Sequence, residues 1–443
     1  MTRLNPSRFS PVAIGIATIA LFTALPAAAQ TEIQWWHAMT GALGDRVNDF
    51  AKDFNASQSQ YKVVPVFKGS YAETMTAAIA ATRAGNPPHI VQVFEVGTAT
   101  MMSAKKSVKP VHELMREAGE KFDPKAYVSA VTGYFSDAKG NLVSFPFNSS
   151  TTVFYYNKDA FKRAGLDPNK SPATWPEVMA AAAKIKVAGD KCAFSSGWQS
   201  WVHLENFSAW HNVPFASKNN GFGGTDARLM FNSPLHEKHI ANMADWMKKG
   251  YFTYGGRTNE AESKFFSGEC AMLTSSSAAY ANIKRNAKFD WAVGPLPYYR
   301  DVPGAPQNTI IGGASLWVMN GKPAGDYKGV AKFFTFLSDP QRQATWHQVT
   351  GYLPITHAAY EVTKKAGFYD KNPGTDVSVK QMIEKDVTLS SRGLRLGNFV
   401  QIRAVIDEEL EGVWSGKQTA KAALDNAVKR GNEQLEKFQS ANK

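Results

Sequence analysis

The sequence is poor in the residues that build several common kinds of site. Its 443 residues include only two cysteines, too few for a disulfide scaffold or a multi-cysteine zinc module. It has nine histidines, but none with the spacing of a zinc-binding motif. A GxSxG nucleophile elbow and a GxxxxGK[ST] phosphate loop are both missing. We therefore expect no metal, no cofactor and no catalytic residue, and we expect the scattered histidines to lie mostly at the surface.

Charge of one sign is not concentrated anywhere in the chain. There are 50 Lys and Arg against 38 Asp and Glu, a net charge of +12, and the basic residues do not form a run. This pattern gives little support to nucleic-acid binding, so we expect no nucleic-acid partner. The 44% hydrophobic content excludes a disordered chain. A chain of this length is expected to fold as two domains rather than around one core.

Long hydrophobic runs are missing except at the N-terminus. Arg3 and Arg8 precede and flank an apolar run at 12–25, and small residues follow at 27–29. This order is typical of a secretory signal peptide, with an uncleaved anchor as the alternative. We expect residues 1–29 to be removed on export, which leaves 48 basic against 38 acidic residues, a net charge of +10.

The first part of the exported chain alternates between strand and helix patterns. Strands are expected at 33–36, 61–67 and 89–94, and helices at 43–54 and 71–82. Short connections between such elements predict a parallel, doubly wound sheet. Ligands of these sheets bind beyond the carboxyl ends of the strands, so function is expected at the loops that follow the three strands.

Residues at these strand ends allow more than one interpretation. Trp35 and Trp36 point to opposite faces of a strand, so one of them is expected in the core. Tyr71 begins a helix, and it either meets a ligand near free N–H groups or is an ordinary aromatic residue at a helix start. Glu95 follows a buried strand, and it either accepts hydrogen bonds from ligand hydroxyls or forms a structural ion pair.

A second α/β unit begins near residue 150. The polar stretch 148–151 is typical of a hinge, and a strand at 153–157, a helix at 158–164, a capping box at 174–177 and a strand at 192–195 follow it. Trp198 and Trp201 either form an aromatic platform for a ligand or belong to the core. Cys192 and Cys270 fall on strands of this unit, and they either form one disulfide or remain buried thiols.

Two later segments also have features of a binding site. Residues 274–277, Thr-Ser-Ser-Ser, are expected to open a helix, where their hydroxyls and the free N–H groups either suit a phosphate or simply cap the helix. Gly312 and Gly313 let the backbone approach a ligand, which makes 311–313 a second hinge candidate. The final third of the chain is expected to be helical.

Several motifs carry a resemblance to a known family. They include Tyr-Tyr-Asn-Lys at 155–158, Thr-Trp-Pro-Glu at 174–177, and the segments 68–71, 92–100, 146–150, 197–199, 305–315, 350–354 and 393–398. Through them the whole mature chain resembles the extracellular solute-binding proteins of ABC transporters, in the carbohydrate-type branch, and among these the ones that take up sn-glycerol-3-phosphate. The resemblance implies an α/β, two-lobed periplasmic binding protein fold of type II. Each lobe would be a doubly wound, mostly parallel sheet with helices on both faces, and the ligand would lie in the cleft between the lobes.

The resemblance also implies lobe boundaries and a site. The N-terminal lobe would contain residues 30–147 and about 313–355, and the C-terminal lobe about 148–312 and 356–443. Matched position by position, the implied ligand-binding residues are Tyr71, Glu95, Ser150, Ser276, Gly313, Tyr352 and Arg403, with Trp198 and Trp201 beside them. Ser70 departs from the relatives, which often carry Asn there, and this difference leaves Tyr71 in place.

In the implied site the charged residues are expected at opposite ends of the ligand. Arg403 would bind the phosphate, with serine and tyrosine hydroxyls donating to the same oxygens. Glu95 would repel phosphate and is therefore expected at the glycerol end, which would reject inorganic phosphate. The two tryptophans would form apolar walls and can face a choline group. Without the resemblance, an ion pair of Arg403 with Asp407 or Glu408 is the simpler expectation.

The implied function is that of a monomeric periplasmic binding component of an ABC importer, which is not an enzyme. It would bind sn-glycerol-3-phosphate, and glycerophosphodiesters such as glycerophosphocholine. Lobe closure would then deliver the ligand to a membrane permease and its ATPase subunits. The alternatives are an oligosaccharide-binding protein of the same family and an exported phosphodiester hydrolase.

Overall fold

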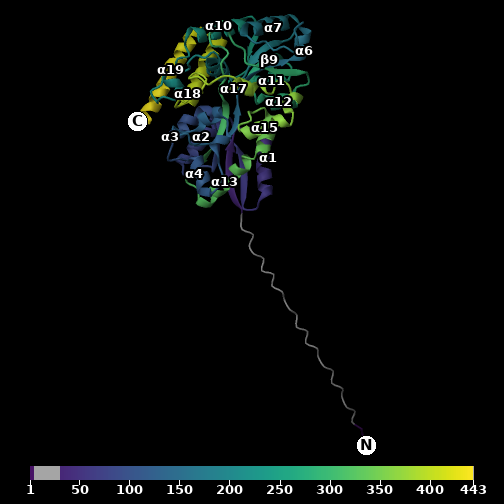
Figure 1. The fold of residues 1–443 in the computed structure, drawn as a ribbon, viewed down its shortest axis with the longest axis vertical. Helices are drawn as coiled ribbons and strands as arrows, with labels where there is room; N and C mark the ends of the chain where they lie inside the picture. The colour runs from purple at the N-terminus through teal and green to yellow at the C-terminus, as the bar shows by residue number, and fades with distance from the viewer. Residues whose placement is uncertain (4–29, 443) are drawn as a thin grey trace.

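Two separate β-sheets with surrounding helices form the folded part of the chain (Figure 1). The computed structural model describes residues 1–3 and 30–442. Apart from its first three residues, the predicted signal peptide lies outside the described residues. The helices described below pack on both faces of each sheet, as the resemblance implies.

The first sheet has six strands, five of them from the N-terminal part of the chain. They are β1 (Thr31–His37), β2 (Tyr61–Phe67), β3 (Ile90–Phe94), β4 (Val108–Lys109), β5 (Phe145–Ser150) and β11 (Gly312–Met319). β1 lies between β2 and β3 and is parallel to both, as the alternating pattern predicts. β11 pairs antiparallel with β3, β4 and β5, so it is the only reversed strand of this sheet.

The second sheet has five strands from the middle of the chain. They are β6 (Thr152–Asn157), β7 (Cys192–Ser196), β8 (Phe252–Tyr254), β9 (Cys270–Ser276) and β10 (Trp291–Gly294). β7 is parallel to β8 and β9, whereas β6 is antiparallel to both β9 and β10. Each sheet therefore has one reversed strand, and the prediction of mostly parallel sheets is confirmed.

The reversed strands lie where the chain crosses between the sheets. β5 ends at Ser150 and β6 begins at Thr152, so Thr151 alone separates them. The return crossing enters β11 at Gly312, which pairs with Ser150, and the two crossings therefore run side by side. The Thr151 hydroxyl donates to the Ile310 carbonyl at 3.0 Å. Both segments predicted as hinges thus belong to one hydrogen-bonded ribbon between the lobes.

Helices occupy most of the remaining chain. In chain order, the helices and short helical turns are α1 (Gly41–Ser57), α2 (Tyr71–Arg83), η1 (Glu95–Gly97), α3 (Thr98–Ser103), α4 (Val111–Ala118), η2 (Pro124–Ala126), α5 (Ser129–Phe135), α6 (Lys158–Arg163), α7 (Trp175–Val187), η3 (Trp201–Asn206), α8 (Phe207–Trp210), α9 (Ser217–Asn220), α10 (Pro234–Lys248), α11 (Glu260–Phe266), α12 (Ala279–Asn286), α13 (Ala324–Leu337), α14 (Pro340–Thr350), α15 (His357–Lys365), α16 (Phe368–Lys371), α17 (Val377–Ile383), α18 (Phe399–Trp414) and α19 (Ala420–Ala441). The predicted capping box before α7 is present, with Thr174 and Glu177 each bonding the other's backbone N–H.

The two faces of the first sheet bury different residues. Trp35 is fully buried on the face covered by α1, α4 and α13. Trp36 is half-buried on the other face, where α2 packs against Val91 and Val93. In Figure 1, α1 and α2 lie on opposite sides of the first strands. The opposite orientation of the two tryptophans follows from the two-residue period of a strand.

The second sheet is likewise covered on both faces. Trp175 and Ile185 of α7 pack with Phe194 of β7, in a core that also includes residues of α10, α18 and α19. On the other face, Phe265 of α11 and Ile283 of α12 pack against β6 and β9. In Figure 1, α18 and α19 run along the outside of this lobe and carry the C-terminus.

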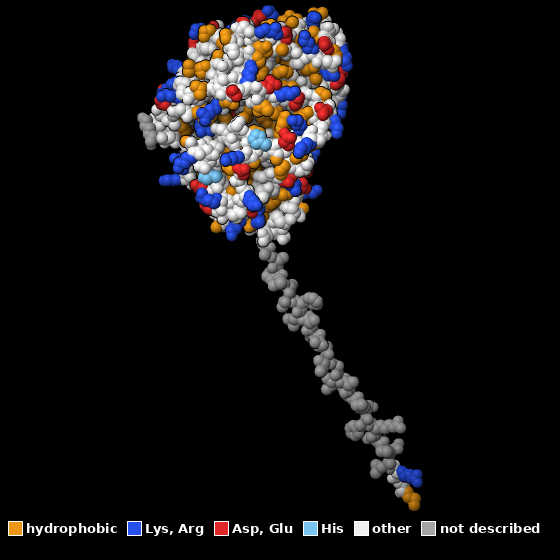
Figure 2. Space-filling view, in the orientation of Figure 1, with side chains coloured by type: hydrophobic (Ala, Val, Ile, Leu, Met, Phe, Trp, Pro, Cys, Tyr) orange, Lys and Arg blue, Asp and Glu red, His pale blue; other side chains and the backbone are white. Residues whose placement is uncertain are grey.

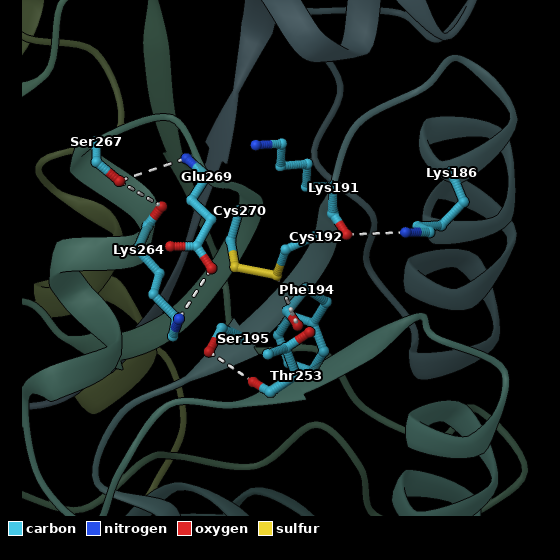
Figure 3. Close-up of a disulfide and its surroundings, with 10 residues drawn as sticks. All are labelled: Lys186, Lys191, Cys192, Phe194, Ser195, Thr253, Lys264, Ser267, Glu269 and Cys270. Atoms are coloured by element: carbon cyan, nitrogen blue, oxygen red, sulfur yellow. Dashed lines mark hydrogen bonds and ion pairs between the residues drawn. A yellow bond between two sulfur atoms is a disulfide. The ribbon is translucent and has the colours of Figure 1, made fainter.

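A disulfide joins two neighbouring strands of the second sheet (Figure 3). Cys192 of β7 and Cys270 of β9 are register partners, and their Cα atoms lie 4.4 Å apart. Both side chains are buried. Of the two alternatives for this pair, the disulfide is therefore the one that the structure contains.

The prediction that the histidines lie mostly at the surface is wrong. Seven of the nine are buried: His37, His89, His203, His211, His236, His239 and His347. In the second lobe, the His203 and His239 rings approach to 3.0 Å between Nδ1 and Nε2, and the Ser196 hydroxyl lies 2.8 Å from Nε2 of His203. Burial lowers the pKa of His203 to about 3. These imidazoles are neutral core groups whose nitrogens are satisfied internally, which a count of histidines cannot show.

The surface carries charge of both signs. Figure 2 shows Lys and Arg side chains interspersed with Asp and Glu over the face in view, without a region of one sign. This mixture agrees with the even spread of basic residues along the sequence. Among the described helices, none combines the length and the hydropathy that a bilayer span requires.

Candidate functional site

A cavity of about 380 Å³ lies between the two lobes. Its size is at the lower end of the range of about 300–1,000 Å³ that is usual for small-molecule sites. The structure brings together all nine residues implied by the resemblance, since each of them lines this cavity: Tyr71, Glu95, Ser150, Trp198, Trp201, Ser276, Gly313, Tyr352 and Arg403.

Most of these residues lie at the ends of strands or the starts of helices. Glu95 follows β3, Ser150 ends β5 and Ser276 ends β9, so both sheets present their strand ends to the cavity. Tyr71 is the first residue of α2, behind a capping box formed by Ser70 and Glu73. The serine that departs from the family pattern therefore fixes the start of the helix that carries Tyr71.

Arg403 of α18 is the centre of a buried charge cluster. Its Nε and Nη2 donate to the two carboxylate oxygens of Glu205 at 2.9 and 2.6 Å, and Nη2 also donates to Glu95 at 2.7 Å. The exposed fractions are 8% for Arg403, 5% for Glu95 and 1% for Glu205. Within residues 1–3 and 30–442, Nη1 of Arg403 has no hydrogen-bond acceptor. Three of the five guanidinium N–H groups therefore donate to carboxylates, and the two N–H groups of Nη1 are left for a ligand.

Two sequence-based expectations about Arg403 are wrong. The first placed Arg403 and Glu95 at opposite ends of the ligand, whereas the two side chains form an ion pair. The second paired Arg403 with Asp407 or Glu408 on its own helix, but its carboxylate partners come from η1 and η3. Glu408 instead pairs with Arg430. Long-range partners prevail because Arg403 faces the cleft, where the carboxylates of other elements converge.

Sequence reasoning missed Glu205, which lies on η3 four residues after Trp201. The surrounding segment Trp201-Val202-His203-Leu204 is apolar and buried. An acid at the end of such a segment needs a cation or several donors, because an unpaired buried charge is unfavourable. That signal was available in the sequence, although it does not identify the partner.

Burial changes the protonation of the carboxyl groups around the cleft. Burial raises the pKa of Glu95 and outweighs the opposing effect of Arg403. Burial also raises the pKa of Asp407, behind Arg403 on α18, to about 7. Glu262 of α11 lines the cavity and was not predicted; burial raises its pKa to about 7, although it accepts from the Ser275 hydroxyl at 2.9 Å. The cavity wall thus contains carboxyl groups that can hold a proton at neutral pH.

Tyr71 belongs to a hydrogen-bonded and stacked group on the first lobe. Its ring stacks on Phe94 with the centroids 5.2 Å apart, and Trp198 of the other lobe lies 6.4 Å away. Its hydroxyl accepts from Asn148 Nδ2 at 2.9 Å, and Gln92 in turn donates to Asn148 at 2.8 Å. Burial raises the pKa of Tyr71 well above its usual value, so the hydroxyl is neutral. Tyr71 therefore forms part of the cavity wall and also packs against the hydrophobic core next to α2.

Gly312 and Gly313 allow the close packing beside the return crossing. A Cβ on Gly312 would overlap the Trp201 ring, and a Cβ on Gly313 would overlap the Asn148 carbonyl. Gly313 also has φ +86°, in the left-handed region that favours glycine. Because neither glycine has a side chain, the Trp201 ring can pack against Gly312 and the Asn148 carbonyl of β5 can pack against Gly313.

The serine segment differs from its prediction. Residues 274–276 end strand β9, and the next helix, α12, begins only at Ala279. Ser276 Oγ accepts from the Ala278 backbone N–H at 3.1 Å, so it orders the turn between them. A run of hydroxyl residues at the end of a buried strand resembles a helix start in sequence, because such residues occur in both settings. Ser276 still faces the cavity, from a strand end.

No group of three or more His, Cys, Asp or Glu side chains suited to a metal ion is found among the residues that the structure describes. The chemistry of the cavity is that of directed hydrogen bonding: a guanidinium edge, hydroxyls of serine and tyrosine, and aromatic walls. Such a set can hold a small polar ligand with an anionic group.

Comparisons with known proteins agree with this architecture. Residues 49–374 match the model of the bacterial extracellular solute-binding protein family. The UgpB protein of Salmonella paratyphi A, an sn-glycerol-3-phosphate-binding periplasmic protein, is 56% identical over 432 residues, covering 97% of this chain and 98% of that protein. Its Escherichia coli O1:K1 counterpart is 54% identical over 443 residues, covering 99% and 100%.

Solved structures share the fold. Mycobacterium tuberculosis UgpB, in complex with glycerophosphocholine, superposes with a TM-score of 0.77 at 21% identity, covering 92% of this chain and 99% of that one. Maltose-bound MalE3 of T. maritima superposes with a TM-score of 0.72 at 17% identity, covering 91% and 99%. The family match and the near full-length relatives leave one assignment: the chain belongs to the bacterial extracellular solute-binding proteins.

Proposed function

We propose that this chain is the periplasmic substrate-binding component of an ABC importer and binds sn-glycerol-3-phosphate. The observation that carries the proposal is that Nη1 of Arg403, a buried arginine in the interlobe cleft, donates to no described residue, whereas Nε and Nη2 donate to carboxylates. Relatives at 54–56% identity are named as sn-glycerol-3-phosphate-binding periplasmic proteins, which supports this ligand. A guanidinium edge is suited to phosphate oxygens.

The proposal assigns roles to the nine cavity residues. Arg403 binds the phosphate through Nη1; Ser150, Ser276, Tyr352 and the Gly313 N–H complete its cage, and Glu95 holds the guanidinium in place through their ion pair. Tyr71, Trp198 and Trp201 form the walls. The proposal includes glycerophosphodiesters such as glycerophosphocholine, which the M. tuberculosis UgpB structure contains.

Delivery of the ligand completes the proposal. We place the lobe boundaries as the resemblance implies, at residues 30–147 with about 313–355 and about 148–312 with 356–443. The hydrogen-bonded crossings at 148–151 and 310–313 are the proposed hinge. Closure around the ligand would present a surface to a membrane permease with its ATPase subunits. The protein acts in the periplasm as a monomer after removal of residues 1–29, and it is a binding protein rather than an enzyme.

A second candidate ligand is an oligosaccharide. The stacked Tyr71 and Phe94 and the nearby Trp198 are the kind of surface that binds a sugar ring, and two structural neighbours hold maltose and maltotetraose. Nη1 of Arg403 favours the phosphate ester, because an anionic phosphate oxygen is a stronger acceptor for a guanidinium N–H than a neutral sugar hydroxyl.

A thermal-shift panel tests the proposal directly. Glycerol-3-phosphate, glycerophosphocholine, maltose and inorganic phosphate are added to the purified mature chain, and a ligand that binds only the folded state raises the Tm. We expect the two glycerol esters to raise it and the other two to leave it unchanged. An increase in Tm with maltose alone would show that the ligand is a sugar and not a phosphate ester.

Calorimetry on Arg403→Ala then tests the assigned residue. We expect binding of glycerol-3-phosphate to become unmeasurable. The matched control is Arg430→Ala, which also removes an arginine with two carboxylate partners, Glu408 and Glu409, but from α19 and not from the cavity lining. Wild-type affinity in Arg403→Ala would remove Arg403 from the phosphate site, whatever the ligand panel shows.

A further inference from the structure

The cavity has an unexpected charge for a site that binds an anion. Among its lining residues, three are acidic, namely Glu95, Glu260 and Glu262, and Arg403 is the one basic residue. Directly behind the lining lie the further carboxyls of Glu205, which is 1% exposed, and of Asp407, which is 7% exposed. A phosphate ester would therefore enter a cavity in which carboxyl groups outnumber cations.

Glu205 makes a more extensive contact with Arg403 than Glu95 does. It takes both Nε and one Nη2 hydrogen, a two-point contact that fixes the guanidinium plane. Glu95 accepts from the same Nη2. Arg403 thus meets two carboxylates before any ligand arrives, and the three side chains together carry a net charge of −1 when all are ionised.

We propose that Glu205 makes the cleft select phosphate esters by charge, so that a singly charged diester binds as it is and a doubly charged monoester binds only with uptake of a proton. The inference rests on the proposed function and deepens it. It makes Glu205 a positioning and specificity-determining residue, because it orients Arg403 and cancels its charge without facing the ligand itself.

The physical basis is the difference in charge between the two ester classes. A phosphate monoester carries about −1.5 to −2 at pH 7, since its second pKa is about 6, whereas a diester retains a single charge. Each added negative charge in a water-poor cleft disfavours ionised carboxyls nearby. The proton can come to rest on the ester or on a cleft carboxyl, and either location is measured as uptake by the complex.

The surrounding groups can accept that proton. Burial raises the pKa of Glu95, and it raises the pKa of both Glu262 and Asp407 to about 7. The other titratable or charged groups that face these carboxyls are Tyr71 of α2 and Tyr134 of α5 near Glu95, Tyr155, Tyr352 and Glu260 near Glu262, and Tyr254 and Arg257 near Asp407. Burial raises the pKa of all five tyrosines above the usual value, so they stay neutral and do not compensate the carboxylates.

Calorimetry at pH 8 in two buffers of different ionisation enthalpy measures the proton count. For wild-type protein we expect uptake of about one proton with glycerol-3-phosphate and less than half as much with glycerophosphocholine, following the charge difference between the esters. Equal proton counts for the two esters, or none with the monoester, would overturn the proposal. Absence of binding by both esters would overturn the proposed function and this inference with it.

The variant Glu205→Gln tests the residue itself. It keeps the shape of the side chain and removes one negative charge, so we expect monoester proton uptake to fall at least twofold and the affinity ratio of monoester to diester to rise about tenfold, one charge being worth roughly a pKa unit or more here. The control Glu408→Gln makes the same change in net charge on the outside of α18. An unchanged ratio in Glu205→Gln, or an equal change in Glu408→Gln, would refute the role of Glu205.

Discussion

Replacement of Arg403 by alanine has a calculable effect on stability, independent of any ligand. The substitution leaves Glu95 and Glu205 buried and facing one another, after the loss of contacts at 2.7, 2.9 and 2.6 Å. Removal of one partner from a buried ion pair typically costs about 3–5 kcal/mol, because the remaining charge is uncompensated. We expect a loss of that size in the free energy of unfolding at pH 8.

The loss should depend on pH in a defined direction. In the variant, desolvation and mutual repulsion raise the carboxyl pKa values of the folded state above those of the unfolded chain. A raised folded-state pKa means that stability is present at low pH and is lost as pH rises through that pKa. The difference between wild type and Arg403→Ala should therefore shrink by about half or more between pH 8 and pH 5, where the carboxyls become protonated.

Urea unfolding at both pH values, followed by tryptophan fluorescence, measures the effect. Arg430→Ala is the control; its side chain is 39% exposed and pairs with Glu408 and Glu409, so its loss should cost no more than about 1 kcal/mol at either pH. Equal losses of stability in the two variants, or the same cost of Arg403→Ala at pH 5 and pH 8, would contradict an uncompensated buried charge in this cluster.

Three further outcomes are expected. Gly313→Ala should weaken ester binding at least about tenfold in calorimetry, because Gly313 has φ +86° and no room for a Cβ. The control Gly321→Ala should leave the affinity unchanged, because Gly321 has a similar φ of +92° but no atom within 4 Å of a Cβ. Replacement of Cys192 and Cys270 by serine opens a link between residues 78 apart, which should lower the unfolding free energy by about 4 kcal/mol on a chain-entropy basis; equal urea midpoints would contradict this. Burial lowers the pKa of His236 to about 3, so its contribution to stability is present above pH 6.5 and is lost as pH falls, by about 2 kcal/mol at pH 5. His236→Asn should therefore flatten the acid limb of a plot of Tm against pH, and an unchanged limb would exclude this contribution of His236.

Much of the fold is predictable because its signals are local. A few neighbouring residues determine each of three features. These are the opposite orientations of Trp35 and Trp36 on their strand, the capping box at Thr174 and the start of α2 at Tyr71. The order of the first three strands follows from the handedness and length of their connections. The prediction of a helix start at 274–277 is wrong because hydroxyl residues suit both a buried strand end and a helix start.

The site was predictable only in part, for a different reason. Family motifs identify which residues line the cavity, but they do not state which of them touch. Arg403 and Glu205 are 198 residues apart in sequence, and no periodicity relates them. Electrostatic partners of this kind are set by tertiary packing, as are the pKa values of Glu262 and Asp407, so they emerge only with the structure.

The position of β11 has a consequence for the order in which the chain folds. β4 and β5 pair with β11 and with no other described strand, and β11 itself pairs with β3. The first sheet therefore stays incomplete until Gly312–Met319 has been synthesised, although its other strands end by Ser150. The intervening second-sheet strands, from Thr152 to Gly294, are all made before that. As the chain emerges from its N-terminus, the second lobe therefore has all its strands before the first sheet is complete, and the helices α18 and α19 that cover the second sheet come after both sheets.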